Sequence, residues 1–539
     1  MKRTDLPAPP LPPGRPNIVL TGFMGTGKST SGPPAAELLD LEYVDLDRRQ
    51  ERIAGMALPR IFEELGEPAF REIERRAIVE AVALSASAIA SGGGAAPLHP
   101  EQFAKLSEGN LVVVLTSTPE AIAGRVGDAH DRPLLTANPE EQIRKLLAER
   151  AEAYAAAGEQ VETTDVPAEE TAKQIVELYR KRAPEGLTRI EVAAPGHGPV
   201  ILGDGAIGTL GSELSALLPD ARKVGVVSDP NARDAGESAA ESISSAGMEV
   251  VRIPLPSGEA AKGIAALAEL LTAMRENGIE PTDVVVAVGG GATLDAAGFA
   301  AATYARGIAL VNMPTTLLAM VDAGLGGKVA IDHAGAKNLV GTFHPPRLVL
   351  ADPSALGSLP EGELRTGFAE IVKAAMLASP LFLDWLEAED PMTNIGWVIE
   401  QAVRIKAGYV AADPRDRGVR KSLNLGHTFA HAIESASGYE VSHGEAVSAG
   451  LIAAARLGVE HGVTDARLPE RLASMLERLG LPQVAPKGLE PDALVSAMAA
   501  DKKRSSGEAV FVVPTDKGAA LLAGIEPAEA VSHLDGGRA

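Results

Sequence analysis

The chain has 539 residues, of which 45% are hydrophobic and 23% charged, an ordinary globular composition. At about 100 to 200 residues per domain, this length predicts three or four domains. The 50 Lys and Arg side chains against 72 Asp and Glu give a net charge of −22, which argues against nucleic acid or an anionic membrane surface as a partner. The absence of cysteine excludes disulfides, thiolate metal sites and cysteine nucleophiles.

The first residues are rich in proline and lack an apolar stretch. We therefore expect residues 1–16 to be a disordered or extended tail and not a secretory signal, and we expect a cytoplasmic protein. From residue 17 to 180, short apolar runs alternate with amphipathic helical patterns, which predicts an α/β domain with a parallel sheet. The expected strands after the first are Glu42–Leu46, Ala88–Ser91 and Leu111–Leu115.

The pattern breaks over residues 181–189, where we expect a linker. A second α/β unit, with a Rossmann-like fold, is expected over residues 190–352. From residue 353 to 539 the Ala and Leu spacing of three and four predicts a mainly helical domain. The expected strands of the second unit are Lys223–Ser228, Glu249–Pro254, Asp283–Val288 and Ala309–Met313.

The first strand, which begins at Asn17, runs directly into the phosphate-loop pattern Gly22-x4-Gly27-Lys28-Ser29. Glycines let backbone N–H groups curl around phosphates, the lysine reaches the β and γ oxygens, and the serine hydroxyl is a ligand for Mg²⁺. The sequence therefore predicts nucleotide binding.

Residues 17 to about 165 resemble shikimate kinase. The resemblance rests on motifs in a fixed order: GFMGTGKST, Asp45-Leu-Asp47, Ile61-Phe, Gly66-Glu67, Phe70-Arg71, Glu74, Gly92-Gly93-Gly94, Arg132-Pro-Leu-Leu135, Glu149-Arg150 and Tyr154. It implies ATP with Mg²⁺ and a fork-shaped arginine clamp on the shikimate carboxylate. The implied ATP and Mg²⁺ residues are Gly25, Gly27, Lys28, Ser29, Thr30, Asp45, Arg125 and the lid residue Arg132; the implied shikimate residues are Asp47 as base, Arg71, Gly93 and Arg150.

Family members continue a helix from the P-loop lysine for about three turns, whereas this chain has Pro33 and Pro34 within that stretch. Each proline removes a helical donor, so we expect a kinked or shortened helix. A nucleotide-binding domain without catalysis is the alternative for this half.

In the second half, a glycine triplet follows the expected strand ending at Val288, which allows close approach to a pyrophosphate. Two histidines, His427 and His431, are spaced for one helix face, His443 follows, and Glu370 precedes Lys373 by three residues. One carboxylate and two imidazoles make an open three-ligand site for a divalent metal such as Zn²⁺.

Residues from about 190 to 535 resemble 3-dehydroquinate synthase. The matching motifs are Ser257-Gly-Glu259-x-x-Lys262, GGGATLDAAGF, Tyr304-Ala-Arg306-Gly, PTTLLAMVDAGLGGK, AKNLVG, Gly367-Phe-Ala-Glu370-x-x-Lys373, Arg420 with LNLGHTFAHAIE, HGEAV and Asp501-Lys502-Lys503. The resemblance implies NAD⁺, one Zn²⁺ or Co²⁺ ion and a homodimer formed through this half.

By this resemblance, Glu370, His427 and His443 hold the metal, and Arg306 reaches across the dimer to the substrate phosphate. The implied NAD residues are Asp229, Glu259, Lys262, Gly290, Gly291, Asp295, Thr315, Thr316, Asp322, Lys337 and Asn338. The implied substrate residues are Lys328, Lys337, Asn338, Lys373, Lys406, Arg420, Asn424, His431 and Lys502, of which Lys328, Lys373, Arg420 and His431 are assigned to catalysis.

The implied substrate is a seven-carbon 2-keto-3-deoxy sugar acid phosphate, which loses phosphate by β-elimination after a transient oxidation by NAD⁺. Two departures stand out: Asp322-Ala-Gly-Leu replaces the family's Asp-Ser-Ser-Val, and Asp413-Pro-Arg-Asp416 replaces Asp-Glu-x-Glu. Two alternatives stay open, a polyol dehydrogenase that uses NAD and a metal, and another sugar-phosphate cyclase.

Overall fold

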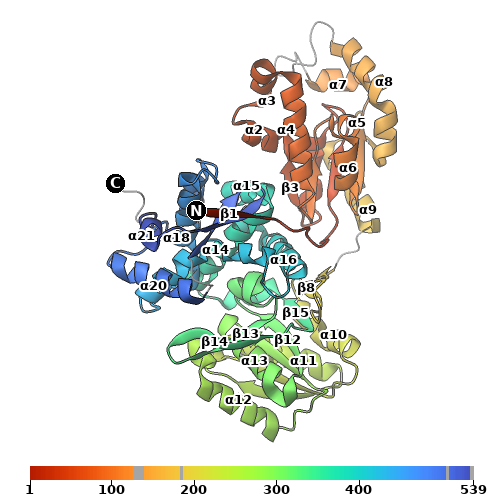
Figure 1. Ribbon diagram of the computed structural model, residues 1–539. Helices are drawn as coiled ribbons and strands as arrows, with labels where there is room; N and C mark the ends of the chain where they lie inside the picture. The colour runs from red at the N-terminus through yellow and green to blue at the C-terminus, as the bar shows by residue number, and fades with distance from the viewer. Residues whose placement is uncertain (127–138, 183–185, 505–508, 535–539) are drawn as a thin grey trace.

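A computed structural model describes residues 1–126, 139–182, 186–504 and 509–534. Figure 1 shows two α/β domains at opposite ends of the molecule, with the mainly helical domain between them. The α/β class and the order of domains expected from the sequence are therefore found in the structure.

The N-terminal domain is built on a five-stranded parallel sheet with the strand order β3-β4-β2-β5-β6. Its strands are β2 (Ile18–Thr21), β3 (Glu42–Asp45), β4 (Ser87–Ala90), β5 (Leu111–Thr116) and β6 (Glu159–Glu162). Its helices are α1 (Lys28–Glu37), α2 (Leu46–Ala54), α3 (Leu58–Arg60), η1 (Ile61–Leu65), α4 (Gly66–Ala81), α5 (Ala95–Leu98), α6 (Pro100–Ser107), α7 (Pro119–Val126), α8 (Pro139–Ala157) and α9 (Ala168–Arg182). Because the three adjacent strands β3, β4 and β2 are parallel, the loops that follow them meet at one edge of the sheet.

The helix after the P-loop is not ended by its prolines. Helix α1 continues to Glu37 with Pro33 and Pro34 inside it. Gly32 allows Tyr43 of β3 to pack against this helix, because a Cβ atom at Gly32 would lie 2.4 Å from the tyrosine ring. The 10 residues of α1 come close to the three turns found in the family, so the prolines shorten this helix little. The helix keeps its place beside the sheet.

The second α/β domain contains a seven-stranded sheet with the order β10-β9-β11-β12-β15-β8-β7, in which only β7 is antiparallel to its neighbour. The strands are β7 (Thr188–Ile190), β8 (Val200–Leu202), β9 (Lys223–Ser228), β10 (Glu249–Pro254), β11 (Val284–Gly289), β12 (Ala309–Pro314) and β15 (Leu348–Ala351), and β13 (Lys328–His333) and β14 (Ala336–Phe343) form a separate hairpin. The helices are η2 (Ala206–Thr209), α10 (Leu210–Leu217), η3 (Pro230–Ala232), α11 (Arg233–Ser245), η4 (Gly258–Lys262), α12 (Ile264–Glu276), α13 (Gly291–Thr303), η5 (Tyr304–Arg306), η6 (Ala319–Ala323) and η7 (Pro353–Ser358).

The C-terminal domain packs its helices around long buried faces of α14, α16 and α18. Its helices are α14 (Glu361–Ala378), α15 (Pro380–Ala388), η8 (Pro391–Asn394), α16 (Ile395–Ala412), η9 (Val419–Asn424), α17 (His427–Ala436), α18 (His443–Glu460), α19 (Leu468–Arg478), α20 (Pro491–Arg504) and α21 (Pro527–Val531). The domain also contains a hairpin of β16 (Val510–Thr515) and β17 (Gly518–Ala523), which the helical reading of this region missed.

The first residues of the expected tail are extended and not disordered. Strand β1 (Lys2–Pro7) pairs antiparallel with β17 along its whole length and completes a three-stranded sheet. Backbone hydrogen bonds hold this edge strand, so it needs no apolar face of its own. The linker is also shorter than expected, because α9 extends to Arg182 and β7 begins at Thr188, and residues 183–185 lie outside the described part.

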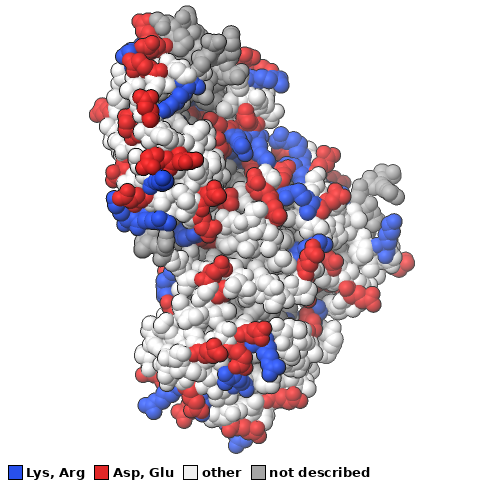
Figure 2. Space-filling model, turned by 180° about the vertical axis from the view of Figure 1, so that it is seen from behind, with Lys and Arg blue, Asp and Glu red and all other residues white. Residues whose placement is uncertain are grey.

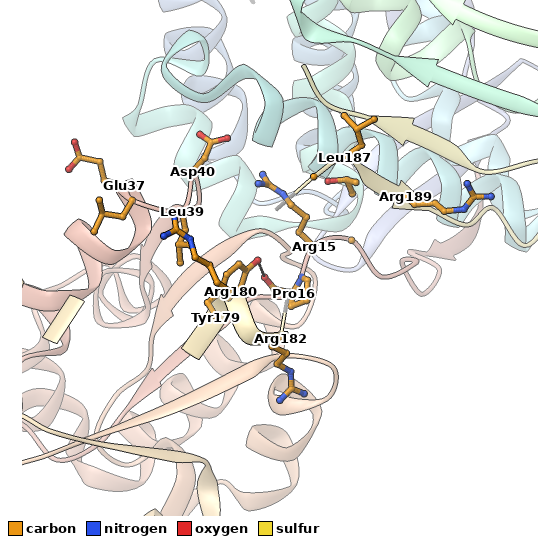
Figure 3. Close-up of a pocket in the computed structure, with 14 residues that line it drawn as sticks. Arg15, Pro16, Glu37, Leu39, Asp40, Tyr179, Arg180, Arg182, Leu187 and Arg189 are labelled. Atoms are coloured by element: carbon orange, nitrogen blue, oxygen red, sulfur yellow. Dashed lines mark hydrogen bonds between the residues drawn. The ribbon is translucent and has the colours of Figure 1, made fainter. Parts of the chain in front are cut away.

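The two halves of the chain are in contact through the helical domain. The indole of Trp397 donates to the carbonyl of Ser85 over 3.0 Å, and Arg15 pairs with the buried Glu400 over 3.1 Å. A cavity of about 570 Å³ lies at this junction, and Figure 3 shows its lining from the N-terminal segment, α1, α9 and β7. None of the site residues expected from the sequence lines it.

Acidic and basic side chains are intermixed over the face in Figure 2. No helix in the described part of the chain is both long and apolar enough to cross a membrane.

Candidate functional sites

The P-loop connects β2 to α1 and is shaped by three glycines in the left-handed region, Gly22, Gly25 and Gly27. The Lys28 amine donates to the carbonyls of Gly22 and Phe23 over 2.7 and 3.0 Å. Ser29 and Thr30 are exposed at the start of the helix. Backbone N–H groups, a cation and a hydroxyl thus lie together, as a triphosphate with Mg²⁺ requires.

Of the four residues expected to bind shikimate, Gly93 belongs to the glycine triplet after β4, and the side chains of the other three converge on that triplet. Arg150 donates to the Gly93 carbonyl over 3.4 Å. A Cβ atom at Gly92 would lie 3.6 Å from Asp47 Oδ1, and one at Gly94 would lie 2.9 Å from an Arg71 nitrogen. One at Gly93 would lie 3.3 Å from the Gly22 carbonyl of the P-loop, so the two arginines expected to bind a carboxylate and the phosphate loop are neighbours.

Glu74 and His99 support this site, and the role of His99 was missed from the sequence. Arg71 donates to Glu74 over 2.8 Å, and His99 contacts the same carboxylate oxygen over 3.1 Å. Burial raises the pKa of Glu74, but the hydrogen bond with His99 and the charge of Arg71 outweigh it and lower the pKa. Glu74 therefore stays ionised and holds Arg71 in place.

The remaining expected residues of the kinase half contact the backbone around the P-loop and α2 or lie outside the described residues. Asp45 caps α2 by accepting from the Asp47 backbone N–H over 3.0 Å. Arg125 donates to the Gly25 carbonyl and to Thr163, so it braces the P-loop. Arg132 lies outside the described residues.

The residues expected to bind NAD gather at the carboxyl edge of β9 and β11. Asp229 caps η3 and accepts from the Thr293 hydroxyl over 2.9 Å, and Lys262 pairs with Asp295 over 2.7 Å. Burial raises the pKa of Asp295 to about 6, against the attraction of Lys262.

Other members of the expected NAD set lie close by in the fold. Asn338 accepts from Lys262, and Lys337 pairs with Glu259 over 3.1 Å. A Cβ atom at Gly290 would lie 3.2 Å from the Thr316 methyl group, whereas Gly291 begins α13 and the Thr315 N–H donates to Gly289 over 3.0 Å. A glycine turn, a helix N-terminus and mixed charges together suit a dinucleotide.

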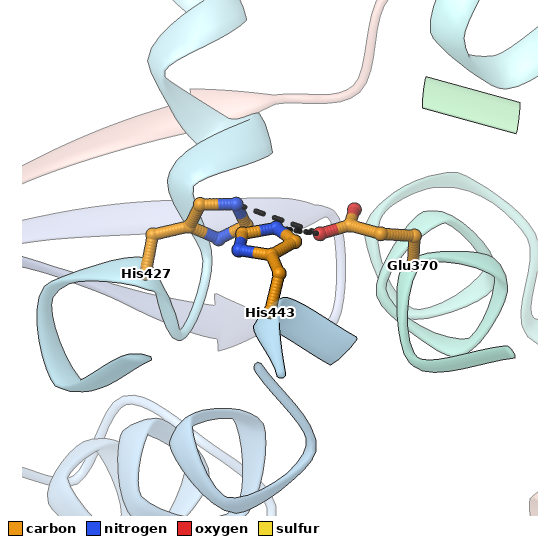
Figure 4. Close-up of side chains that lie close together, drawn as sticks. All are labelled: Glu370, His427 and His443. Carbon is orange, nitrogen blue, oxygen red and sulfur yellow. Dashed lines mark ion pairs between the residues drawn. The ribbon is translucent and has the colours of Figure 1, made fainter. Parts of the chain in front are cut away.

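The metal ligands expected from the sequence lie together in the helical domain (Figure 4). Glu370 projects from α14, and His427 and His443 are the first residues of α17 and α18. Both Nε2 atoms lie 3.5 Å from Glu370 Oε1, and the three ligand atoms fall within 4.8 Å of one another. His431, one turn further along α17, is not part of this group.

The chemistry of this cluster fits a divalent cation. Both Glu370 oxygens are buried: Oε2 pairs with Lys373, while Oε1 faces the two imidazole Nε2 atoms at 3.5 Å. One carboxylate oxygen and two imidazole nitrogens are a ligand set that suits a divalent cation. The Nδ1 atoms of His427 and His443 face the Leu425 carbonyl and the Glu434 carboxylate, at 3.1 and 3.4 Å, which leaves both Nε2 atoms for a metal. The contact of Glu434 was not foreseen from the sequence.

The electrostatics of the cluster agree with this reading. Burial, with the nearby charge of Lys373, holds the pKa of His427 well below its usual value, so the ring is neutral as a ligand must be. Burial lowers the pKa of His443, but hydrogen bonds to Glu370 and Glu434 outweigh it and raise the pKa to about 10. A bound metal would take the place of that proton.

Buried cations lie beside the cluster. Lys373 is 2% exposed and pairs with Glu370, while Lys406 is 9% exposed and pairs with Asp322. Burial lowers the pKa of Lys406 to about 8 in spite of the attraction of Asp322. Arg420 is buried and donates to the carbonyls of Gly326 and Pro414, each over 3.2 Å.

The other expected substrate residues are less enclosed. Lys328 is exposed and pairs with Asp416, and Asn424, His431 and Arg306 are exposed. Lys502 lies in α20, whose last side chains are outside the described part.

The fold combines a P-loop domain with a Rossmann-like domain and a helical domain whose Glu370, His427 and His443 could hold a metal ion. Residues 24–180 match the family model for shikimate kinase. Residues 252–366 and 367–504 match the models for the N-terminal and C-terminal parts of 3-dehydroquinate synthase.

The 3-dehydroquinate synthase of Symbiobacterium thermophilum is 41% identical over 333 residues, which are 60% of this chain and 93% of that protein. The chain thus belongs to the 3-dehydroquinate synthase family and carries a shikimate kinase domain before it, a fusion of two enzymes.

Two solved structures are similar to the second half. A 2-epi-5-epi-valiolone synthase from Streptomyces hygroscopicus with NAD⁺ and Zn²⁺ bound is 27% identical, with a TM-score of 0.57 over 62% of this chain and 95% of that one. A 2-deoxy-scyllo-inosose synthase complexed with carbaglucose-6-phosphate, NAD⁺ and Co²⁺ is 24% identical, with a TM-score of 0.57 over 65% of this chain and all of that one, which shows the shared fold.

Proposed function

We propose that both halves of the chain are working enzymes of the shikimate pathway. The N-terminal half transfers a phosphoryl group from ATP to shikimate and forms shikimate 3-phosphate. The C-terminal half converts 3-deoxy-D-arabino-heptulosonate 7-phosphate to 3-dehydroquinate and releases phosphate. The proposal is carried by the cluster of the buried Glu370 with His427 and His443 and its neighbouring lysines, and the family membership of both halves supports it.

In the kinase half, Arg71 and Arg150 bind the shikimate carboxylate, while Asp47 accepts the proton of the attacking hydroxyl group. Lys28 and the P-loop N–H groups neutralise charge on the transferring phosphate, and Ser29 and Asp45 lie where they can hold Mg²⁺. Arg132 and Arg125 are assigned to the transferring phosphate and to the nucleotide. Because these residues are all present, we favour catalysis over a nucleotide-binding domain without turnover.

In the synthase half, Glu370, His427 and His443 hold Zn²⁺ or Co²⁺, and the carboxyl edge of β9 and β11 holds NAD⁺. These groups supply polarisation and reversible oxidation of a substrate hydroxyl. Lys373, Lys406 and Arg420 bind the carboxylate and phosphate of the substrate, and their burial strengthens that attraction.

The other residues proposed for the synthase sites fall into an NAD set and a substrate set. The remaining proposed NAD residues are Asp229, Glu259, Lys262, Gly290, Gly291, Asp295, Thr315, Thr316, Asp322, Lys337 and Asn338. The remaining proposed substrate residues are Lys328, Lys337, Asn338, Asn424, His431, Lys502 and, from a dimer partner, Arg306.

Two other activities of the second half are separable by assay. A polyol dehydrogenase would accumulate NADH, but its substrate has no phosphate to occupy the buried lysines. Another sugar-phosphate cyclase would release phosphate from a different ketose phosphate. The 41% identity to a 3-dehydroquinate synthase favours that enzyme over the valiolone synthase at 27%.

The test is to assay the purified full chain for both reactions. We expect ADP formation from Mg-ATP that depends on shikimate, and phosphate release from the heptulosonate phosphate without net NADH. ATP binding without turnover would contradict the kinase assignment, and phosphate release from another ketose phosphate alone would contradict the synthase assignment. We also expect a cytoplasmic homodimer formed through the synthase half, which light scattering of the full chain and of a chain lacking residues 1–182 would check.

A further inference from the structure

The segment that carries Asp45 and Asp47 is held on both sides by residues of the synthase half. On the upstream side, Glu42 of β3 accepts from the indole of Trp385 over 2.8 Å and from Asn394 over 3.2 Å. Trp385 belongs to α15 and Asn394 to η8, both in the helical domain. The strand that leads into the proposed kinase site is therefore tied to the other enzyme.

On the downstream side, Arg49 joins the kinase helices to the same α15. Its guanidinium, 8% exposed, donates to Asp384 over 2.7 Å and to Glu80 over 2.6 Å. Arg49 is in α2, two residues after Asp47, and Glu80 is in α4, the helix that also carries Arg71. One buried arginine thus connects Asp384 to two of the three helices that carry the proposed shikimate-binding side chains.

The Asp384 carboxylate is itself held rigidly. It is 8% exposed, and Arg471 of α19 donates to its second oxygen over 3.0 Å. Charge-assisted hydrogen bonds with a planar guanidinium fix direction as well as distance. A buried pair of this kind contributes more to orientation than to net stability, because desolvation offsets much of its attraction.

We propose that Asp384 of the synthase half is a positioning residue for the kinase half: through Arg49 it orients α2 and so places Asp47 for shikimate. This inference rests on the proposed kinase activity. It makes part of the kinase substrate site dependent on the synthase fold, although the two reactions share no intermediate.

Docking of the two halves does not depend on Asp384 alone. Away from α2, Gln401 donates to the Ser85 carbonyl over 3.0 Å and Arg404 donates to the Ala83 carbonyl over 2.8 Å. The indole of Trp397 is fully buried against Ser85 as well. Neutralising Asp384 should therefore leave the halves docked while it loosens α2, which Arg52 still joins to Glu387 of α15.

The experiment compares Asp384→Asn with the unmodified full chain. We expect the KM for shikimate to rise about tenfold, since small displacements of a positioning group are costly. The KM for ATP, the kinase kcat and both synthase constants should stay within about twofold. Glu470→Gln is the matched control, because it removes one carboxylate from the exposed residue next to Arg471.

Two further measurements test the position of α2 independently of Asp384 and of kinase turnover. Trp385→Phe removes the hydrogen bond to Glu42 but keeps an aromatic ring, and we expect a shikimate KM about threefold higher. Amide exchange of Leu46–Ala54 should be faster in Asp384→Asn than in the unmodified chain.

An unchanged shikimate KM, an unchanged α2 exchange rate, or an equal loss in both halves would overturn the positioning role. If the unmodified chain forms no ADP with shikimate, the kinase assignment fails. The exchange rate of α2 then still decides whether Asp384 orients this helix.

Discussion

The two proposed active sites differ in how far their charged groups are buried. In the kinase half, Ser29, Thr30 and Asp47 are exposed, and Lys28 contacts neutral carbonyls of its own loop. In the synthase half, Glu370 and Lys373 are 3% and 2% exposed and pair with each other. Loss of Lys28, Ser29 or Asp47 leaves no buried charge behind in the first site, where only Arg71 among the described site residues covers a buried carboxylate, that of Glu74. Loss of Glu370 or Lys373 in the second site leaves its partner buried and charged. Substitutions in the synthase site should therefore cost stability as well as activity.

The largest effect is expected from His427→Ala. Loss of an imidazole ligand should lower synthase activity by about 10³-fold or more, because the metal is bound poorly and transition-state charge is no longer stabilised. Metal content measured by atomic emission and activity with excess Zn²⁺ check this. Shikimate-dependent ADP formation should be unchanged, and His461→Ala, on the far end of α18, is the control. A fully active variant without metal would contradict the assigned ligand.

Lys28→Ala should have the opposite pattern. We expect kinase kcat to fall by about 10²- to 10³-fold, since a cation that neutralises the transferring phosphate is lost. Unlike His427→Ala, it should leave the melting temperature nearly unchanged, because Lys28 is partly exposed at the start of α1. Lys105→Ala, on the exposed side of α6, is the control. A large loss of synthase activity in Lys28→Ala would contradict the separation of the two sites.

The sequence predicts elements that depend on local patterns better than elements that depend on contacts between distant residues. Strands β9 and β10 were predicted with their observed ends, because apolar runs bounded by turns are local signals. Strand β1 was missed because its sequence has no apolar face and its partner β17 lies at the other end of the chain. The β16 hairpin was also missed, although the apolar run Val510–Thr515 is a strand signal that periodicity analysis could have found.

The candidate sites show the same limit. Motif spacing was enough to group Glu370, His427 and His443, and the structure brings their ligand atoms together. It did not reveal Glu434 behind His443, because a carboxylate one helix away has no special spacing. Nor did it reveal Asp384 beside Arg49, since the contact joins residues 335 positions apart.

Glu434→Gln should weaken metal binding without removing a ligand. The carboxylate of Glu434 faces His443 Nδ1, and such partners orient a ligand imidazole and raise its basicity. We expect metal affinity to fall by about 10- to 100-fold, measured by competition with a chelator, with activity restored by excess Zn²⁺. Glu440→Gln, an exposed neighbour, should have no effect. Unchanged metal affinity in Glu434→Gln would remove Glu434 from the site.

The smallest effect is the pH dependence set by Lys406, whose pKa burial lowers to about 8. Because the protonated amine attracts the anionic substrate, synthase kcat/KM should fall above about pH 8, by at most about tenfold per pH unit. Unfolding does not explain this fall. An unfolded lysine has a pKa near 10.4, so between about pH 8 and pH 10 the unfolded chain binds more protons than the folded chain. This titration therefore raises the free energy of unfolding as the pH rises. Lys406→Gln should lower kcat/KM at neutral pH and abolish the step. A step that persists in that variant would assign the titration to another group.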